Sequence, residues 1–198
     1  MYFCAVRVVL PVEDPDLGDT ADKKYKPLNY TTMVTKVLLM ATALLPVIAW
    51  GQKVDTTPVS SFQVGKFLGS WYEIARFDHG FERGMDMTTA RYSLSDDGKI
   101  KVVNSGVKDG KVKTSIGKAK LTETQGLLRV SFFGPFYSDY RVLMVSDDYK
   151  YALIGSKSAK YLWILARTPQ VPDDVIEKIL FEARSRGYDL SELIWIKH

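Results

Sequence analysis

Eight short runs of strand-forming residues follow one another between Trp71 and Arg167, and turn residues separate them. Most runs alternate apolar with polar residues or are short and apolar, a pattern that indicates antiparallel strands and not strands alternating with helices. Asp97-Gly98 and Asp109-Gly110 are typical of tight hairpins between such strands. We therefore expect strands at 69–78, 88–95, 99–106, 112–123, 127–133, 139–146, 150–156 and 160–168.

Eight sequential antiparallel strands predict an all-β fold, an up-and-down barrel. Closure removes both exposed sheet edges and leaves an interior that holds one small ligand. A two-sheet sandwich is the alternative that the same pattern allows.

After Thr168-Pro169 the apolar period becomes helical, which predicts one C-terminal helix packed against the outside of the barrel. Its apolar stripe comprises Val175, Ile176, Ile179, Leu180 and Ala183. Residues 193–196 are then expected to form one short final strand.

The N-terminal region differs in composition from the rest of the chain. Residues 1–32 combine prolines and mixed charge without a regular period, so we expect them to be disordered or absent from the mature protein. Residues 33–51 carry Lys36, an apolar run and a small-x-small ending, which is typical of a signal peptide. A buried core helix is the alternative for this run. We expect translation to start at Met33 and export to leave the domain 52–198.

Charge and cysteine usage limit the class of protein further. The net charge is +4 and both signs are interspersed, so a dedicated nucleic-acid surface is not expected, although weak attraction to anionic lipid is allowed. Cys4 is the single cysteine, so no intrachain disulfide forms and the core alone must hold the domain together. No cysteine ends the apolar run as a lipid-attachment motif requires. We therefore expect an exported protein of the periplasm or outer membrane that is soluble.

Three motifs resemble those of the lipocalin family, and specifically the bacterial lipocalin branch, which is similar to apolipoprotein D and plant temperature-induced lipocalins. Gly69-Ser70-Trp71 corresponds to the first motif, Asp147-Asp148-Tyr149 to the second and Arg167 to the third. Asp147 departs from the threonine that is commonest there. Stretches that resemble the branch itself are 71–79, 81–84, 130–136 and 161–165.

The resemblance implies a barrel whose closed end is built on five structural residues. These are Gly69, Trp71, Asp148, Tyr149 and Arg167. The arginine is expected to pack across the tryptophan ring by a cation–π contact, and direct ligand contact is the alternative role for this pair. The resemblance also implies a carrier of fatty acids or lysophospholipids, linked to outer-membrane lipid storage, maintenance or stress.

Strand alternation selects the candidate ligand-binding residues, because Arg129 and Arg141 mark the outer face of their strands. The predicted lining comprises Ala90, Tyr92, Leu94, Leu128, Val130, Phe132, Tyr140, Val142, Met144, Tyr161, Trp163 and Leu165. Its tyrosine hydroxyls suit a ligand with a long tail and a hydrogen-bonding head. A core without a ligand is the alternative. Glu73 shares the inward parity of Trp71 and is expected to be a buried carboxylate with a structural hydrogen bond.

No Ser-His-Asp order, Cys-His pair or metal-ligand spacing is present in the sequence. We therefore expect no catalytic residue, no metal and no cofactor. The expected partners are a small-molecule lipid and, transiently, a membrane surface, with no nucleic acid. A lipid-modifying enzyme and a binder of haem, bilin or a carotenoid are the alternatives.

Overall fold

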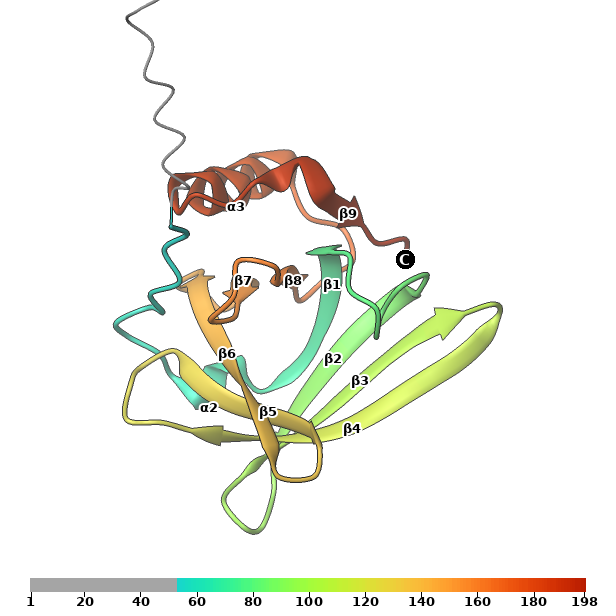
Figure 1. Ribbon diagram of the computed structural model, residues 1–198, viewed down its shortest axis with the longest axis vertical. Coiled ribbons are helices and arrows are strands. Elements are labelled where there is room, and N and C mark those ends of the chain that lie inside the picture. The colour runs from blue at the N-terminus through green and yellow to red at the C-terminus, as the bar shows by residue number, and fades with distance from the viewer. Residues whose placement is uncertain (1–52) are drawn as a thin grey trace, which may run out of the picture. The chain divides into compact units, whose positions relative to one another are not determined.

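The computed structural model describes residues 53–198, in which eight antiparallel strands close into an up-and-down barrel (Figure 1). The barrel strands are β1 (Gly69–Phe77), β2 (Asp86–Leu94), β3 (Ile100–Lys108), β4 (Lys111–Leu121), β5 (Leu127–Phe133), β6 (Phe136–Val145), β7 (Tyr151–Gly155) and β8 (Leu162–Ala166). The predicted all-β barrel is confirmed. The predicted leader, 1–32, and signal peptide, 33–51, lie outside the described residues.

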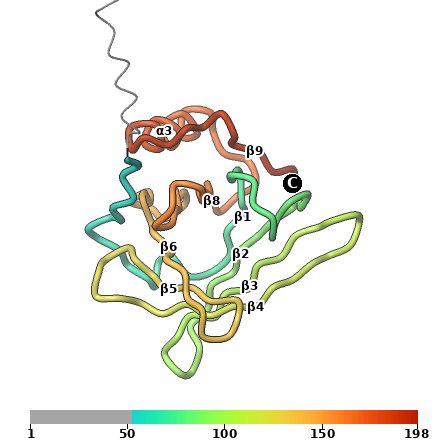
Figure 2. Tube along the Cα trace, in the orientation of Figure 1, coloured from blue at the N-terminus to red at the C-terminus, as the bar shows by residue number. Residues whose placement is uncertain are grey.

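Each barrel strand pairs with the next, and β8 pairs with β1 to close the barrel. Just before β1 the chain forms a short helix, α2 (Val64–Phe67). After β8 it forms the helix α3 (Asp173–Ser185), the 3-10 helix η1 (Leu190–Glu192) and the strand β9 (Leu193–Trp195). Figure 2 shows α3 lying along one side of the barrel. No helix in the described part of the chain is both long and apolar enough to cross a membrane.

Two β-bulges lie on the side of the barrel that α3 covers. The register of β1 on β8 shifts between Glu73 and Ala75, and that of β6 on β7 shifts between Val142 and Met144. Each bulge adds one residue, so two neighbouring side chains point to the same face. These extra outward residues pack in one apolar cluster with the buried side of α3. The bulges therefore widen the surface on which the helix is packed.

The end of the barrel at α2 is closed by Trp71. Its indole Nε1 donates a hydrogen bond to the carbonyl oxygen of Phe67 at 2.8 Å, and the two rings lie 4.8 Å apart between their centroids. The guanidinium carbon of Arg167 lies 3.8 Å from the centre of the indole. This cation–π contact covers the ring from the solvent side, and Trp71 is completely buried.

Arg167 also binds the backbone carbonyl groups around this closed end. Its guanidinium donates hydrogen bonds of 2.8 to 3.3 Å to the carbonyl oxygens of Lys66, Phe67, Leu68, Ser70 and Tyr149. Gly69 has a φ of 98°, and a Cβ there would lie 3.2 Å from Arg167 Nη1. A side chain at position 69 would therefore be strained by its backbone and crowd the arginine.

The β6–β7 turn supports the same closed end. Tyr149 adopts a φ of 56°, and its hydroxyl accepts a hydrogen bond from the backbone N–H of Gln63 at 2.8 Å. Hydrogen bonds from the side chains of Lys150 and Ser146 lower the pKa of Asp148 to about 2. The five residues predicted to be structural thus surround one end of the barrel.

Replacing Arg167 with lysine keeps the charge but removes the planar group that stacks and donates in several directions at once. We expect Arg167→Lys to lower the free energy of unfolding by about 2 kcal/mol. The melting temperature should fall by roughly 4–8 °C, measured by circular dichroism. Arg91→Lys, at an exposed position on β2, is the matched control and should change the free energy by less than about 0.5 kcal/mol. Equal losses in both variants would contradict a special role for Arg167.

Candidate functional site

The barrel interior above Trp71 is lined by a continuous apolar cluster. Eight of the predicted lining residues belong to it: Ala90, Tyr92, Leu128, Val130, Tyr140, Val142, Trp163 and Leu165. They come from β2, β5, β6 and β8, and five of them are buried. The alternation of these strands therefore brings together most of the side chains that the sequence selected.

Met144 does not belong to this lining. The bulge in β6 turns Leu143 and Met144 to the same outer face, where both pack in the cluster that includes α3. The prediction for Met144 was wrong because strict alternation counts no extra residue. Val145 returns to the inside.

Three other predicted residues lie at the ends of the barrel. Leu94 is 66% exposed, because it forms the last pair of β2 before the turn to β3, so its placement in the lining was also wrong. Tyr161 lies just before β8 at the opposite end, where its ring stacks on that of Trp163 with 5.9 Å between centroids. Phe132 is 41% exposed near the end of β5 and is only partly inside.

A pair of tyrosines crosses the apolar chamber. The hydroxyl oxygens of Tyr92 and Tyr140 lie 2.8 Å apart in a hydrogen bond between opposite walls. Burial raises the pKa of both hydroxyls well above the usual value, so both groups are neutral. They supply a polar contact inside the barrel without adding charge.

Arg76 is an interior charge that the sequence analysis missed. Simple alternation from Glu73 places it on the outer face, but the β1 bulge turns it inward opposite Trp163. The guanidinium Nη1 donates to Glu73 Oε1 at 2.7 Å, and the Arg76 side chain is 1% exposed. The sequence did contain a signal for the inward position of Arg76, because it is a charged residue between Ala75 and Phe77 in a nearly apolar run.

The carboxyl of Glu73 is held partly in its neutral form. Burial, reinforced by the nearby charge of Glu82, raises its pKa to about 7, although Arg76 acts in the opposite direction. The predicted burial of Glu73 is thus observed, at 6% exposure. Two carboxyl groups and one guanidinium share a small apolar volume, so its net charge depends on pH near neutrality.

The segment between β1 and β2 folds over the end of the barrel opposite Trp71. Arg76 Nη2 donates to the carbonyl oxygens of Glu82 and Met85 at 2.7 and 3.2 Å. The indole Nε1 of Trp163 donates to Glu82 Oε2 at 3.2 Å. The His79 ring is buried between Phe81 and Trp163, with centroids 4.6 and 4.8 Å away. We call residues 78–85 the lid.

The hairpin of β3 and β4 forms a wall whose polarity changes along its length. From the closed end upward, one face presents the pairs Ile100–Ala119, Val102–Gly117, Asn104–Ser115, Gly106–Lys113 and Lys108–Lys111. Ile100, Val102 and Ala119 belong to the interior cluster, so this face is the inner one. It runs from apolar through neutral polar to positively charged side chains.

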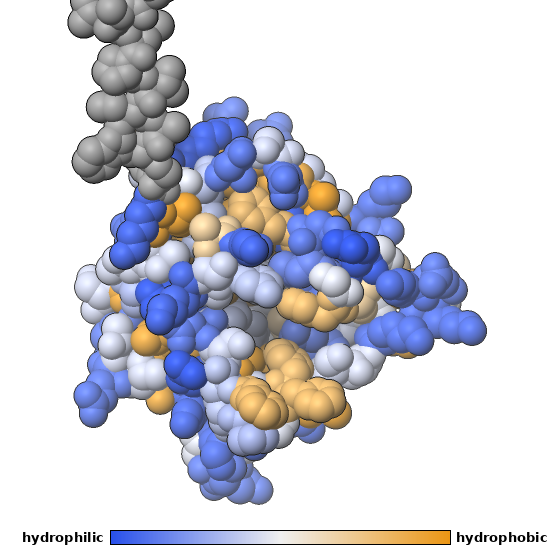
Figure 3. Space-filling view, in the orientation of Figure 1, coloured by the Kyte–Doolittle hydropathy of each residue, from blue (hydrophilic) through white to orange (hydrophobic). Residues whose placement is uncertain are grey.

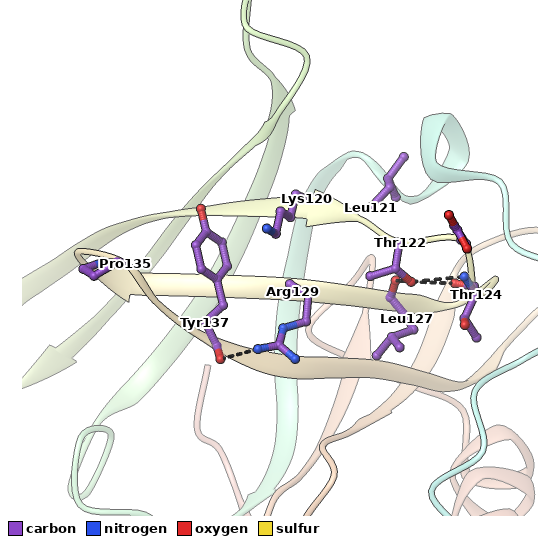
Figure 4. Close-up of a pocket in the computed structure, with 9 residues that line it drawn as sticks. Lys120, Leu121, Thr122, Thr124, Leu127, Arg129, Pro135 and Tyr137 are labelled. Carbon is purple, nitrogen blue, oxygen red and sulfur yellow. Dashed lines mark hydrogen bonds between the residues drawn. The ribbon is translucent and has the colours of Figure 1, made fainter.

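A separate groove of about 660 Å³ lies on the outside of β4, β5 and β6 (Figure 4). Two of its charged residues have partners: Lys120 Nζ lies 4.7 Å from the centre of the Tyr137 ring, and Arg129 binds Asp139 and the carbonyl oxygen of Tyr137. Within residues 53–198, histidine and acidic side chains form no group of three that could hold a metal ion.

The closed floor, the apolar chamber and the polar upper end define a β-barrel that binds small hydrophobic ligands. The family profile described as "Lipocalin-like domain" matches residues 62–198, and the chain belongs to the lipocalin family. Outer membrane lipoprotein Blc of Escherichia coli K12 is 46% identical over 145 residues, which cover 71% of this chain and 82% of that protein.

Two further similarities come from eukaryotes. Temperature-induced lipocalin-1 of Arabidopsis thaliana is 36% identical over 154 residues, covering 72% of this chain and 82% of that protein. The structure of insecticyanin from the tobacco hornworm Manduca sexta superposes with a TM-score of 0.61 at 26% identity. The superposition covers 73% of this chain and 85% of insecticyanin. The resemblance inferred from the sequence motifs is therefore confirmed.

The raised pKa of Glu73 predicts how stability depends on pH. Because the folded protein binds this proton more tightly than the unfolded chain does, the stabilisation is present below pH 4.5 and is lost as pH rises through about 7. Glu73→Gln mimics the neutral form. Between these pH values we expect the wild type to lose about 1–3 kcal/mol of unfolding free energy relative to this variant.

Urea unfolding at pH 4.5 and pH 8 measures this difference. Glu123→Gln, at an exposed position, is the matched control and should follow the wild type at both pH values. Parallel pH dependence of the wild type and Glu73→Gln would show that Glu73 titrates as it does in the unfolded chain.

Proposed function

We propose that this lipocalin is a carrier of single-chain amphipathic lipids, namely fatty acids or lysophospholipids. The observation that carries the proposal is the inner face of the β3–β4 wall, which runs from Ile100 at the floor through Asn104 to Lys108 at the open end. A single-chain lipid has the same order of polarity, from an apolar tail through an ester or hydroxyl group to an anionic head.

The tail end of such a lipid matches the floor of the chamber. Phe67, Trp71 and Val102 are buried there, and each methylene group that leaves water contributes about 0.8 kcal/mol. The hydroxyls of Tyr92 and Tyr140 lie on the same path and offer hydrogen bonds to an oxygen of the ligand. Apolar burial therefore supplies the affinity and the tyrosine pair orients the chain.

The head end matches the positive charges. Lys113 stands on the inner face opposite Gly106, and Lys108 and Lys111 form the next pair toward the hairpin turn. A phosphate or carboxylate placed there is attracted by several exposed ammonium groups, which also favours a rapid approach of anionic lipids.

The hydrogen bonds of the interior carboxyl groups support a carrier role over a catalytic one. Glu73 is bound to Arg76, and Glu82 accepts from Trp163, so the carboxyl groups serve structural hydrogen bonds. The side chain of Thr88 also lies beside Glu73 and lowers the pKa of its carboxyl, as Arg76 does.

An extracytoplasmic site of action is part of the proposal. The relatives from Escherichia coli, Citrobacter freundii and Vibrio cholerae are outer membrane lipoproteins by name. The apolar run that precedes residue 50 supports export. We therefore assign the protein to lipid storage, maintenance or stress response at the outer membrane, with transient contact between barrel and membrane surface.

Mass spectrometry of lipids released from natively purified protein tests the carrier role. We expect each barrel to release about one molecule of oleic acid or of a lysophosphatidylethanolamine. Adding back 1-oleoyl-lysophosphatidylethanolamine should change the intensity of the tryptophan fluorescence. Failure to release or to rebind either lipid would contradict the proposal, and a released pigment would indicate a different ligand class.

Reversing the charge of Lys113 tests the head-group end. We expect Lys113→Glu to weaken binding of 1-oleoyl-lysophosphatidylglycerol by about three- to tenfold at low salt, with a smaller effect at high salt. Fluorescence titration measures this affinity. Lys101→Glu, on the outer face of β3, is the matched control and should bind as the wild type does. An equal loss of affinity in both variants would show that the net charge of the protein, and not the position of Lys113, causes the effect.

A further inference from the structure

The barrel wall is only half paired between β4 and β5. β4 extends from Lys111 to Leu121, and its residues 111–119 pair with β3. Only its last four residues, from Lys118, pair with β5. In the described residues no strand pairs with the other edge of 111–117. Figure 2 shows the β3–β4 hairpin diverging from β5 and β6 beyond this point.

The barrel has a second place where pairing stops halfway, and there the gap is covered. β1 pairs with β2 only over Gly69–Tyr72. Beyond that point β9 takes the free edge of β1, and the N–H of Met87 on β2 donates to the carbonyl oxygen of Lys197 at 2.8 Å. The part of the chain that the structure describes has no corresponding element between β4 and β5.

A bulge in β5 explains why the strands part. The register of β5 on β6 shifts between Val130 and Phe133, so one extra residue lies on β5. Ser131 Oγ donates to the carbonyl oxygen of Gly134 at 3.1 Å and accepts from the N–H of Phe133 at 3.3 Å, which holds the bulged backbone. A bulge bends its strand and increases the local twist. β5 therefore turns away from β4 directly after its last pair.

Phe132 lies at the point of divergence. A Cβ on Gly117 would lie 2.7 Å from Phe132 Cδ1, so the phenyl ring covers the inner side of β4 at the position where glycine leaves room for it. The residue is 41% exposed, and Ser115, the next inner position of β4, is exposed as well. Solvent thus reaches the inner face of the wall from the side, with the Phe132 ring between it and the chamber.

The two ways into the chamber differ in what holds them shut. The lid over the barrel end is fastened by hydrogen bonds from Arg76 and Trp163 to Glu82. Across the parting of β4 and β5, within residues 53–198, the pairing ends at Lys118 and Ser131, and residues 111–117 pair with no residue of β5. Beyond this last pair the Phe132 ring covers the inner side of Gly117, and partly exposed side chains change rotamer on a picosecond to nanosecond timescale.

We propose that lipids enter and leave the barrel sideways, between β4 and β5, with Phe132 as the gate. This inference rests on the proposed carrier function and specifies its route. A single phenyl ring moves aside without breaking a hydrogen bond, whereas opening the lid removes the partners of a buried arginine. The gate leads directly to the inner positions Gly117 and Ala119 and so to the apolar chamber.

The surface around the gate suits the transfer of lipid from a membrane. Phe133 and Phe136 are 83% and 76% exposed on either side of the β5–β6 turn. Figure 3 shows a hydrophobic patch over this turn and hydrophilic residues over the nearby β3–β4 hairpin. The hairpin carries Lys111 and Lys113, so an apolar tip and positive charges flank the same opening.

Stopped-flow fluorescence with cis-parinaric acid, an 18-carbon fatty acid, tests the route. A gate changes the rates of binding and release together and leaves the equilibrium almost unchanged. We expect Phe132→Ala to raise both rate constants by about three- to tenfold and to change Kd by less than about twofold. Phe132→Trp should lower both rate constants. Melting temperatures confirm that the variants are folded.

Two phenylalanines provide matched controls. Phe81→Ala shortens an exposed side chain on the lid, and Phe133→Ala shortens the neighbour of Phe132; both should retain wild-type rates. Acceleration by Phe81→Ala but not by Phe132→Ala would overturn the lateral route in favour of the lid. A weaker Kd with unchanged rates of association in Phe132→Ala would make Phe132 a pocket wall instead of a gate. Absence of binding by the wild type would overturn the carrier function itself.

Discussion

The contact between Arg167 and Trp71 decides which end of this barrel is closed. One guanidinium stacks on the indole and binds carbonyl oxygens from the α2 region, the start of β1 and the β6–β7 turn. These segments are far apart in the chain, and the arginine binds all three of them. The lid lies at the opposite end of the barrel, where Arg76 binds its backbone.

The β-bulges decide what the rest of the wall does. Two of them turn pairs of side chains toward α3, which buries Ile179 and Ala183 against the barrel. The bulge in β1 has a second effect, since it brings Arg76 inside. The bulge in β5 ends the pairing with β4 and leaves Phe132 at the opening. Single extra residues thus form the surface on which α3 packs, place Arg76 inside the barrel and end the pairing of β4 with β5.

The interior charges divide the chamber into two regions. The tyrosine pair packs on Phe67 at the closed floor, while Glu73, Arg76 and Glu82 occupy the region under the lid. Burial keeps the proton on Glu73 up to near neutral pH, which lessens the cost of placing two carboxyl groups beside one guanidinium. The groups that fasten the lid are therefore the same ones that carry the interior charge.

Most of the barrel was predictable from the sequence because its information is local. Turn pairs such as Asp97-Gly98 set the hairpins, and alternation placed Tyr92, Val142 and Trp163 inside, since consecutive residues of a regular strand face opposite sides. The motif residues Trp71 and Arg167 marked the closed end through their resemblance to the lipocalins. The position of the helix and final strand followed from the change of period after Thr168.

What the sequence alone determined is therefore the order of the strands, the closing pair and most of the lining. The tertiary structure decided the exceptions: Met144 outside, Arg76 inside, Leu94 exposed and Phe132 at a parting of strands. Each depends on where a strand gains a residue or loses its neighbour. A bulge is set by the packing of both partner strands and of α3, and no local pattern of residues records it.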